Sequence, residues 1–154
     1  MLLLKQRLIG KYAQTQVEEV ETAPQIAEWD KSIEAARVVL VTTAGVHLRE
    51  QPIFQVKEHD SSYRIIPGET PIEQLITSHT HFDRADADQD INCVFPLQRL
   101  RELASEGKIG SIAAHHFGLQ GYVPDPTPLI EKVGPEIAEQ LVVDEIDIAI
   151  LSPG

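Results

Sequence analysis

Residues 37–43 read Arg-Val-Val-Leu-Val-Thr-Thr and are apolar on both faces of an extended chain. Such a run is typical of a buried parallel strand, because helices cover both faces of a parallel sheet. Further strands are predicted at 62–66, 109–114 and 146–151, with helical patterns between them. This alternation predicts an α/β fold: an open, mostly parallel sheet with helices on both faces, in three layers.

Helices are predicted where apolar residues recur every three or four positions. The expected helices span 24–36, 96–106 and 129–143, with a helical turn at 70–76 and an ordered loop at 77–93. We expect residues 1–23 to form an N-terminal arm and residues 24–154 to form a single α/β domain. Since no helix follows the last strand to cover it, we expect the domain to be missing its C-terminal part.

The amino-acid composition argues against some classes of binding partner. Thirteen basic and 24 acidic residues give a formal net charge of −11 over 154 residues. Nucleic acids and anionic membrane surfaces both need a basic patch, so neither is expected as a partner. The single cysteine, Cys93, excludes a disulfide within the chain and fits a cytoplasmic protein. The opening apolar run, residues 1–4, is too short to span a membrane.

The carboxyl ends of the predicted strands are the expected site, because open parallel sheets bind ligands there. Polar residues and glycines at these ends are Thr42, Thr43, Gly45, His47, His115, His116 and Gly154. We expect these ends to meet at one edge, with the loop at 78–93 lying over it. Adjacent side chains on a strand point to opposite faces, so one of His115 and His116 at most can face the cleft.

A second pattern, His79-x-His81-x-Asp83, invites a metal-site interpretation, since two imidazoles and a carboxylate can hold zinc or iron. It resembles the start of the metallo-β-lactamase motif, but Arg84 stands where that motif has a further histidine. The alternative is that these side chains bond the loop to itself. We therefore predict no metal and keep a metal-dependent hydrolase as a lesser hypothesis.

Three stretches resemble one known family. They are Thr42-Thr43-Ala44-Gly45-Val46-His47-Leu48, Ser78-His79-Thr80-His81-Phe82-Asp83 and Asp90-Ile91-Asn92-Cys93-Val94-Phe95-Pro96-Leu97. The family is that of the glycine/sarcosine/betaine/D-proline reductase selenoprotein B subunits. The resemblance implies a subunit of an amino-acid reductase that cleaves a carbon–nitrogen bond reductively. It also implies a small amino-acid or amine substrate and a partner subunit that carries a pyruvoyl group.

The resemblance further implies that a selenocysteine nucleophile follows the last strand, directly after Gly154. The 154-residue form is then expected to be inactive. From the strand ends, rather than from the resemblance, we expect His47 with His115 or His116 to surround the nucleophile with positive charge. Substrate contacts are expected from Thr42, Thr43, Gly45, His79, His81 and Asp83.

The uncovered last strand predicts a homo-oligomer, because an exposed strand edge and apolar face attract a partner. The alternative function is a non-catalytic binding or scaffold protein that is complete at Gly154.

Overall fold

The computed structural model describes residues 27–153 except residues 59 and 80–82. The chain divides into two compact units, Met1–Asp30 and Lys31–Gly154, and every described helix and strand lies in the second. The helix expected over 24–36 is wrong for the described residues from 27 on, which hold only a 3-10 turn, η1 (Ile33–Ala35). Trp29 and Ile33 are about half exposed, so no burial stabilises a helix there.

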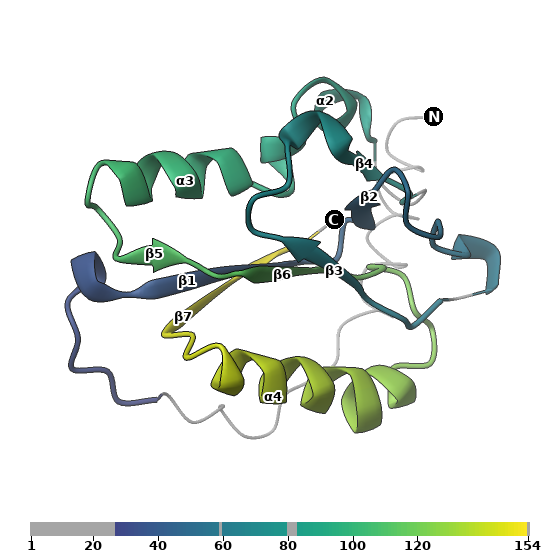
Figure 1. The fold of residues 1–154 in the computed structure, drawn as a ribbon. Coiled ribbons are helices and arrows are strands. Elements are labelled where there is room, and N and C mark those ends of the chain that lie inside the picture. Colours follow the sequence, from purple (N-terminus) through teal and green to yellow (C-terminus); the bar gives the residue numbers. More distant parts are fainter. Residues whose placement is uncertain (1–26, 59, 80–82, 154) are drawn as a thin grey trace, which may run out of the picture. The chain divides into compact units, whose positions relative to one another are not determined.

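Strand β1 (Arg37–Thr42) is the centre of the main sheet. It pairs in parallel with β5 (Ser111–Ile112), β6 (His115–Gly118) and β7 (Ile148–Ser152). Val38 pairs with both Ile112 and Ile148, so β5 and β7 lie on opposite sides of β1. Strand β3 (Arg64–Pro67) pairs antiparallel with β6 (Figure 1). The expected mostly parallel sheet is confirmed.

A small antiparallel ribbon stands beside the main sheet and was not expected from the sequence. It pairs β2 (Val46–Leu48) with β4 (Leu75–Thr77). The turn expected at 70–76 is reduced to the 3-10 turn η3 (Ile72–Gln74), and another such turn, η2 (Val56–Glu58), precedes β3. These strands are too short for a period-2 pattern to reveal them.

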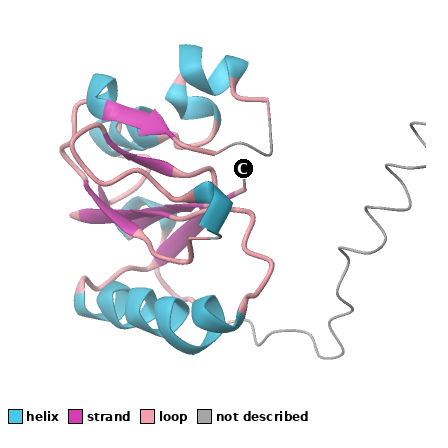
Figure 2. Cartoon of the chain, turned by 90° about the vertical axis from the view of Figure 1, so that its right-hand side faces the viewer, coloured by secondary structure: helices cyan, strands magenta, loops and turns pink. Residues whose placement is uncertain are grey.

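Helices cover both faces of the main sheet, as Figures 1 and 2 show. On one face lie α3 (Leu97–Ser105), α2 (Ala85–Gln89) and the turn η4 (Ile91–Cys93). On the other face lies α4 (Gly134–Val143), entered through a π-helical turn, η5 (Leu129–Val133). The predicted three-layer α/β fold is confirmed, whereas the loop expected over 77–93 contains α2 and η4. No helix in the described part of the chain is long and apolar enough to cross a membrane.

Two hydrophobic clusters fill the layers, one on each face of β1. Val38 and Leu40 pack with α3, whereas Val39 faces α4. This alternation follows from the period of two along a strand. Val133 of η5 and Ile137 of α4 are buried as the pattern predicts, whereas Ile130, within the π turn, is 68% exposed.

Candidate functional site

The carboxyl ends of the parallel strands meet at one level. Thr42 at the end of β1 pairs with Gly118 of β6 and with Ser152 of β7. The pairing continues past the strands, where the Thr43 N–H donates to the Ser152 carbonyl at 3.0 Å. The expected meeting of the first and last strand ends is therefore confirmed. Gly154 lies outside the described residues.

Gly45 joins the strand ends to the small ribbon. Its φ of +68° is in the left-handed region, which glycine adopts without strain. The Gly45 N–H donates to the Leu119 carbonyl at 2.8 Å, and its carbonyl accepts the Ser78 N–H at 2.9 Å. A Cβ at this position would lie 3.1 Å from the backbone nitrogen of His79. The segment at 78–79 is therefore held directly against the end of β1.

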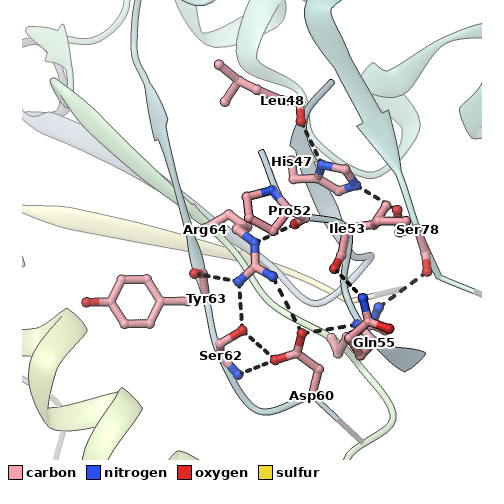
Figure 3. Close-up of polar contacts among 11 residues, drawn as sticks. His47, Leu48, Pro52, Ile53, Gln55, Asp60, Ser62, Tyr63, Arg64 and Ser78 are labelled. Carbon is pink, nitrogen blue, oxygen red and sulfur yellow. Dashed lines mark hydrogen bonds and ion pairs between the residues drawn. The ribbon is translucent and has the colours of Figure 1, made fainter. Parts of the chain in front are cut away.

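His47 and Ser78 form a hydrogen-bonded pair beside this turn (Figure 3). Fully buried His47 places Nδ1 2.7 Å from the Leu48 carbonyl oxygen and Nε2 2.6 Å from Ser78 Oγ. A carbonyl only accepts, so Nδ1 carries the proton and Nε2 accepts the Ser78 hydroxyl proton. Burial lowers the pKa of His47, which keeps the imidazole neutral at pH 7.

A partly buried ion pair supports the loop that packs on His47. The Phe54 ring lies edge-on to the His47 imidazole, with centroids 5.8 Å apart, and the Arg64 guanidinium stacks 4.3 Å from the same ring. Arg64 donates to the Pro52 carbonyl at 2.9 Å and pairs with Asp60 at 3.5 Å. The bonds of Arg64 to Pro52 and Asp60, drawn in Figure 3, anchor the loop before β3.

The carboxylate of this pair is stabilised as an anion. Burial acts to raise the pKa of Asp60, but hydrogen bonds from Ser62 and from the Gln55 N–H, together with the Arg64 charge, hold it below its usual value. At neutral pH Asp60 is therefore charged and paired. The pair of Arg64 and Asp60 therefore has a structural role: it holds the loop that packs on His47.

Gln120 lies just past the end of β6 and forms an isolated bridge with Ala44. Its side chain is 2% exposed, and Nε2 donates to the Ser78 carbonyl at 3.3 Å. Its Oε1 is buried without a hydrogen-bond partner. Sequence reasoning missed both Gln120 and Ser78. The sequence offered one signal for each residue. Gln120 is a polar residue in the loop that follows the predicted strand at 109–114, and Ser78 directly precedes the His79-x-His81-x-Asp83 pattern.

The adjacent histidines, His115 and His116, were expected at the carboxyl end of a strand. The structure does not place them there. The strand predicted at 109–114 breaks at Ala113 and Ala114, so His115 and His116 begin β6 instead. His115 Nδ1 lies 3.1 Å from the Asp144 carboxylate just after α4. His116 is fully buried, and its Nδ1 accepts the Leu40 N–H at 2.9 Å. These contacts place one histidine at the surface and the other in the core.

His47 and His116, which are fully buried, carry no charge at neutral pH. Burial lowers the pKa of His116 to about 4, with the nearby Arg101 charge acting in the same direction. The pKa of His47 is lowered by burial as well. The positive surroundings expected from His47 and His116 are therefore not what the structure provides.

The remaining predicted contacts fall in different places. Thr42 is buried, and its hydroxyl donates to the Val94 carbonyl at 3.0 Å. His79 is 2% exposed beside Gly45, whereas Asp83 accepts the Ala85 N–H at 3.0 Å at the start of α2. His81 lies outside the described residues. Within the described ranges, no group of three or more histidine, cysteine or acidic side chains is arranged to hold a metal ion.

Comparison with known proteins gives one family. A family model described as "Glycine/sarcosine/betaine reductase selenoprotein B (GRDB)" matches residues 2–153. The chain is 38% identical over 124 residues to the D-proline reductase subunit gamma of Acetoanaerobium sticklandii, covering 80% of this chain and 51% of that one. No solved structure matches.

Two further relatives are more distant. The betaine reductase complex component B subunit beta of Peptoclostridium acidaminophilum is 28% identical over 151 residues, covering 92% of this chain and 32% of that one. The glycine reductase complex component B subunit gamma of Carboxydothermus hydrogenoformans is 28% identical over 126 residues, covering 79% and 29% respectively. The chain thus spans about half the length of the first relative and about a third of the other two.

Proposed function

Because this chain belongs to the glycine/sarcosine/betaine reductase selenoprotein B family, we propose that it is part of the selenoprotein subunit of an amino-acid reductase. The observation that carries the proposal is the family match over residues 2–153, nearly the whole chain. The reaction proposed is the reductive cleavage of the bond between nitrogen and the α-carbon of a small amino acid or amine. The greater identity to the D-proline reductase subunit, 38% against 28%, favours D-proline as the substrate.

The proposed reaction site is the edge where β1 and β7 end. A selenocysteine directly after Gly154 would supply the nucleophile, and a pyruvoyl group on a partner subunit would bind the substrate amine. The strand end suits such a group, because Pro153 is exposed and the Thr43 N–H fixes the Ser152 carbonyl. A selenol is largely ionised at neutral pH and needs orientation more than a general base.

The proposal gives this chain's own residues binding and positioning roles. Thr43, Gly45 and His79 line the strand ends and are proposed substrate contacts. His47 acts as a neutral positioning group behind Ser78. Three other residues expected in the site stay predictions: Thr42, His81 and Asp83. His115 and His116 begin β6, away from the strand ends, and are given no role in the site. Residues 1–154 contain no selenocysteine, so this form alone is proposed to be inactive.

The assembly is also part of the proposal. The three relatives are named as subunits of reductases, which favours a partner subunit for this chain. We propose in addition that the chain forms a homo-oligomer in the cytoplasm. Sedimentation of the purified protein tests the oligomer, and co-purification through a tag on this subunit tests the partner.

The deciding experiment reads the DNA directly after the Gly154 codon. TGA followed by an open frame that begins Gly-x-Cys is the expected result, and TAA or TAG would contradict it and favour the binding or scaffold alternative. The activity is tested on the complex purified through this subunit, with D-proline and a dithiol reductant. Cleavage between nitrogen and the α-carbon opens the ring, so the expected product is 5-aminopentanoate.

A further inference from the structure

Strand β7 has an outer edge and one face that are uncovered. Among the strands that the structure describes, β7 pairs only with β1, so the backbone groups of its outer edge have no strand beside them. Leu151 pairs with Val41 on the face that carries α4, whereas Ile150 pairs with Leu40 on the face that carries α3. Leu151 is 74% exposed and Ile150 is 37% exposed. The end of β7 is therefore most exposed on the α4 face.

An apolar groove of about 280 Å³ lies on this face, between β7 and α4. On the strand side Leu151 lines it, and on the helix side Gly134, Ala138 and Leu141 do. These three helix positions are four and three residues apart, so they form one stripe along α4. Gly134 and Ala138 are small and exposed, which lets the backbone of another helix approach closely. The groove therefore has the lining of a helix-packing surface.

The order of the strands indicates which helix belongs there. The Thr42 carbonyl accepts the Leu119 N–H just after β6, and the Thr43 N–H donates to the Ser152 carbonyl of β7. Successive residues of a strand bond to opposite sides, so β6 and β7 lie on opposite edges of β1. The chain passes from β6 to β7 through α4, which covers the face that carries Val39 (Figure 1).

A strand added outside β7 would continue the sheet in the direction of the step from β6 to β7. Connections between parallel strands of one sheet are right-handed in about 98% of cases. Two right-handed connections that run in the same direction across a sheet place their helices on the same face. A helix that leads from β7 to the added strand would therefore lie beside α4, where the groove is.

We propose that the segment that follows Gly154 in the full-length subunit forms a helix that packs into this groove, and then a parallel strand that pairs with the outer edge of β7. The inference rests on the proposed function for its premise that the chain continues past Gly154. The matched region is only 51% of the D-proline reductase subunit gamma, and a βαβ unit needs about 30 residues. The relatives are thus long enough to contain this addition.

The position of the groove favours the chain's own continuation over a separate molecule. Leu151, which lines the groove, lies three residues before Gly154. A segment attached at this point has a high effective concentration at the groove, whereas a second copy or a partner subunit must be captured from solution.

The first test asks whether Leu151 is covered in the full-length subunit. Leu151→Ala is made in that subunit, purified without its partner and with cysteine at the selenocysteine position. Truncation of a buried leucine should lower Tm by about 5–10 °C, whereas truncation of an exposed one changes Tm little. The matched control is Val142→Ala, at an α4 residue that is 78% exposed and does not line the groove, and it should leave Tm within about 2 °C. Equal, small changes in both variants would overturn the proposal.

The second test identifies what covers the groove. The 154-residue chain lacks the proposed helix, so Leu151→Ala should leave its Tm within about 2 °C. An equal loss of Tm in both chain lengths would show that the continuation is not what covers Leu151. A loss in the full-length subunit that disappears on dilution would assign the groove to a second copy. Either result would overturn the proposal, and the dilution series decides alone if the 154-residue chain does not fold.

This proposal and the reductase function fail in different ways. If the complex converts D-proline to 5-aminopentanoate but Leu151→Ala does not lower Tm, the groove assignment is wrong and the reductase function stands. If Leu151→Ala lowers Tm as expected but no 5-aminopentanoate forms, the reductase function is wrong and the groove assignment stands. A TAA or TAG codon directly after Gly154 would overturn both.

Discussion

Protonation of buried His116 should make the folded protein unstable in mild acid. Its imidazole is fully buried, bonds the Leu40 N–H through Nδ1, and leaves Nε2 without a hydrogen-bond partner. Since Nδ1 accepts, the neutral ring carries its proton on Nε2. Charging the ring would break the Leu40 bond and bury an unpaired cation. The pKa is accordingly about 4 in the folded protein, against 6.5 in the unfolded chain.

The sign and size of the effect follow from these two values. A lowered folded-state pKa means that the unfolded chain binds the proton first as pH falls. The contribution to stability is complete above pH 6.5 and is lost progressively as pH falls towards about 4. The difference of about 2.5 pKa units corresponds to roughly 3 kcal/mol in the free energy of unfolding.

The assay is urea unfolding of the full-length protein between pH 7.5 and 4. His116→Asn keeps an acceptor for the Leu40 N–H but does not titrate, so its stability should fall about 3 kcal/mol less over this range. Parallel curves for the parent and His116→Asn would refute the reasoning.

Two further predictions concern packing, and thermal unfolding measures both. Gly118→Ala should prevent folding or lower Tm strongly, because its Cβ would lie 1.9 Å from the Val46 carbonyl oxygen. Gly107 has a φ of +67° but open space around it, so Gly107→Ala should lower the free energy of unfolding by only about 1–2 kcal/mol. Equal effects of the two substitutions would contradict the steric argument. Arg64→Met should destabilise by about 1–2 kcal/mol, between the values typical of exposed and of buried ion pairs, because it leaves the partly buried Asp60 carboxylate without its cation. The exposed pair of Arg99 and Glu102 gives the control, since Arg99→Met should change Tm little, and similar losses in both variants would show that burial of the ion pair does not matter.

The central strand and the long helices could be predicted because each carries its pattern locally. Residues 37–43 are apolar on both faces, and α3 begins directly after Pro96 and ends before Gly107, which has positive φ. The helix expected over 24–36 had a suitable period but lacks a surface to bury its apolar face, at least from residue 27 on. Periodicity indicates which face is apolar, but not whether a neighbour covers it.

The site was harder to predict because it depends on contacts between distant segments. His47 and Ser78 are 31 residues apart and meet through the pairing of β2 with β4. Each of these strands has only three residues, too few for a sequence pattern that would predict their pairing. The position of His116 depended on a break in the preceding strand at Ala113 and Ala114, which an apolar run of small residues does not reveal. The strand ends themselves were predictable, because parallel strands must end at one edge.

The bond between Leu40 and His116 means that a side chain stands in for a peptide group within the sheet. Strand β1 pairs with β5 at Arg37 and Val38 and with β6 at Val41 and Thr42, and the imidazole occupies the interval between them. The sheet keeps its alignment across a gap that backbone alone would leave open. The Leu40 amide resonance is thereby a natural reporter for the protonation of one buried ring, because its hydrogen bond depends on the neutral form of that ring.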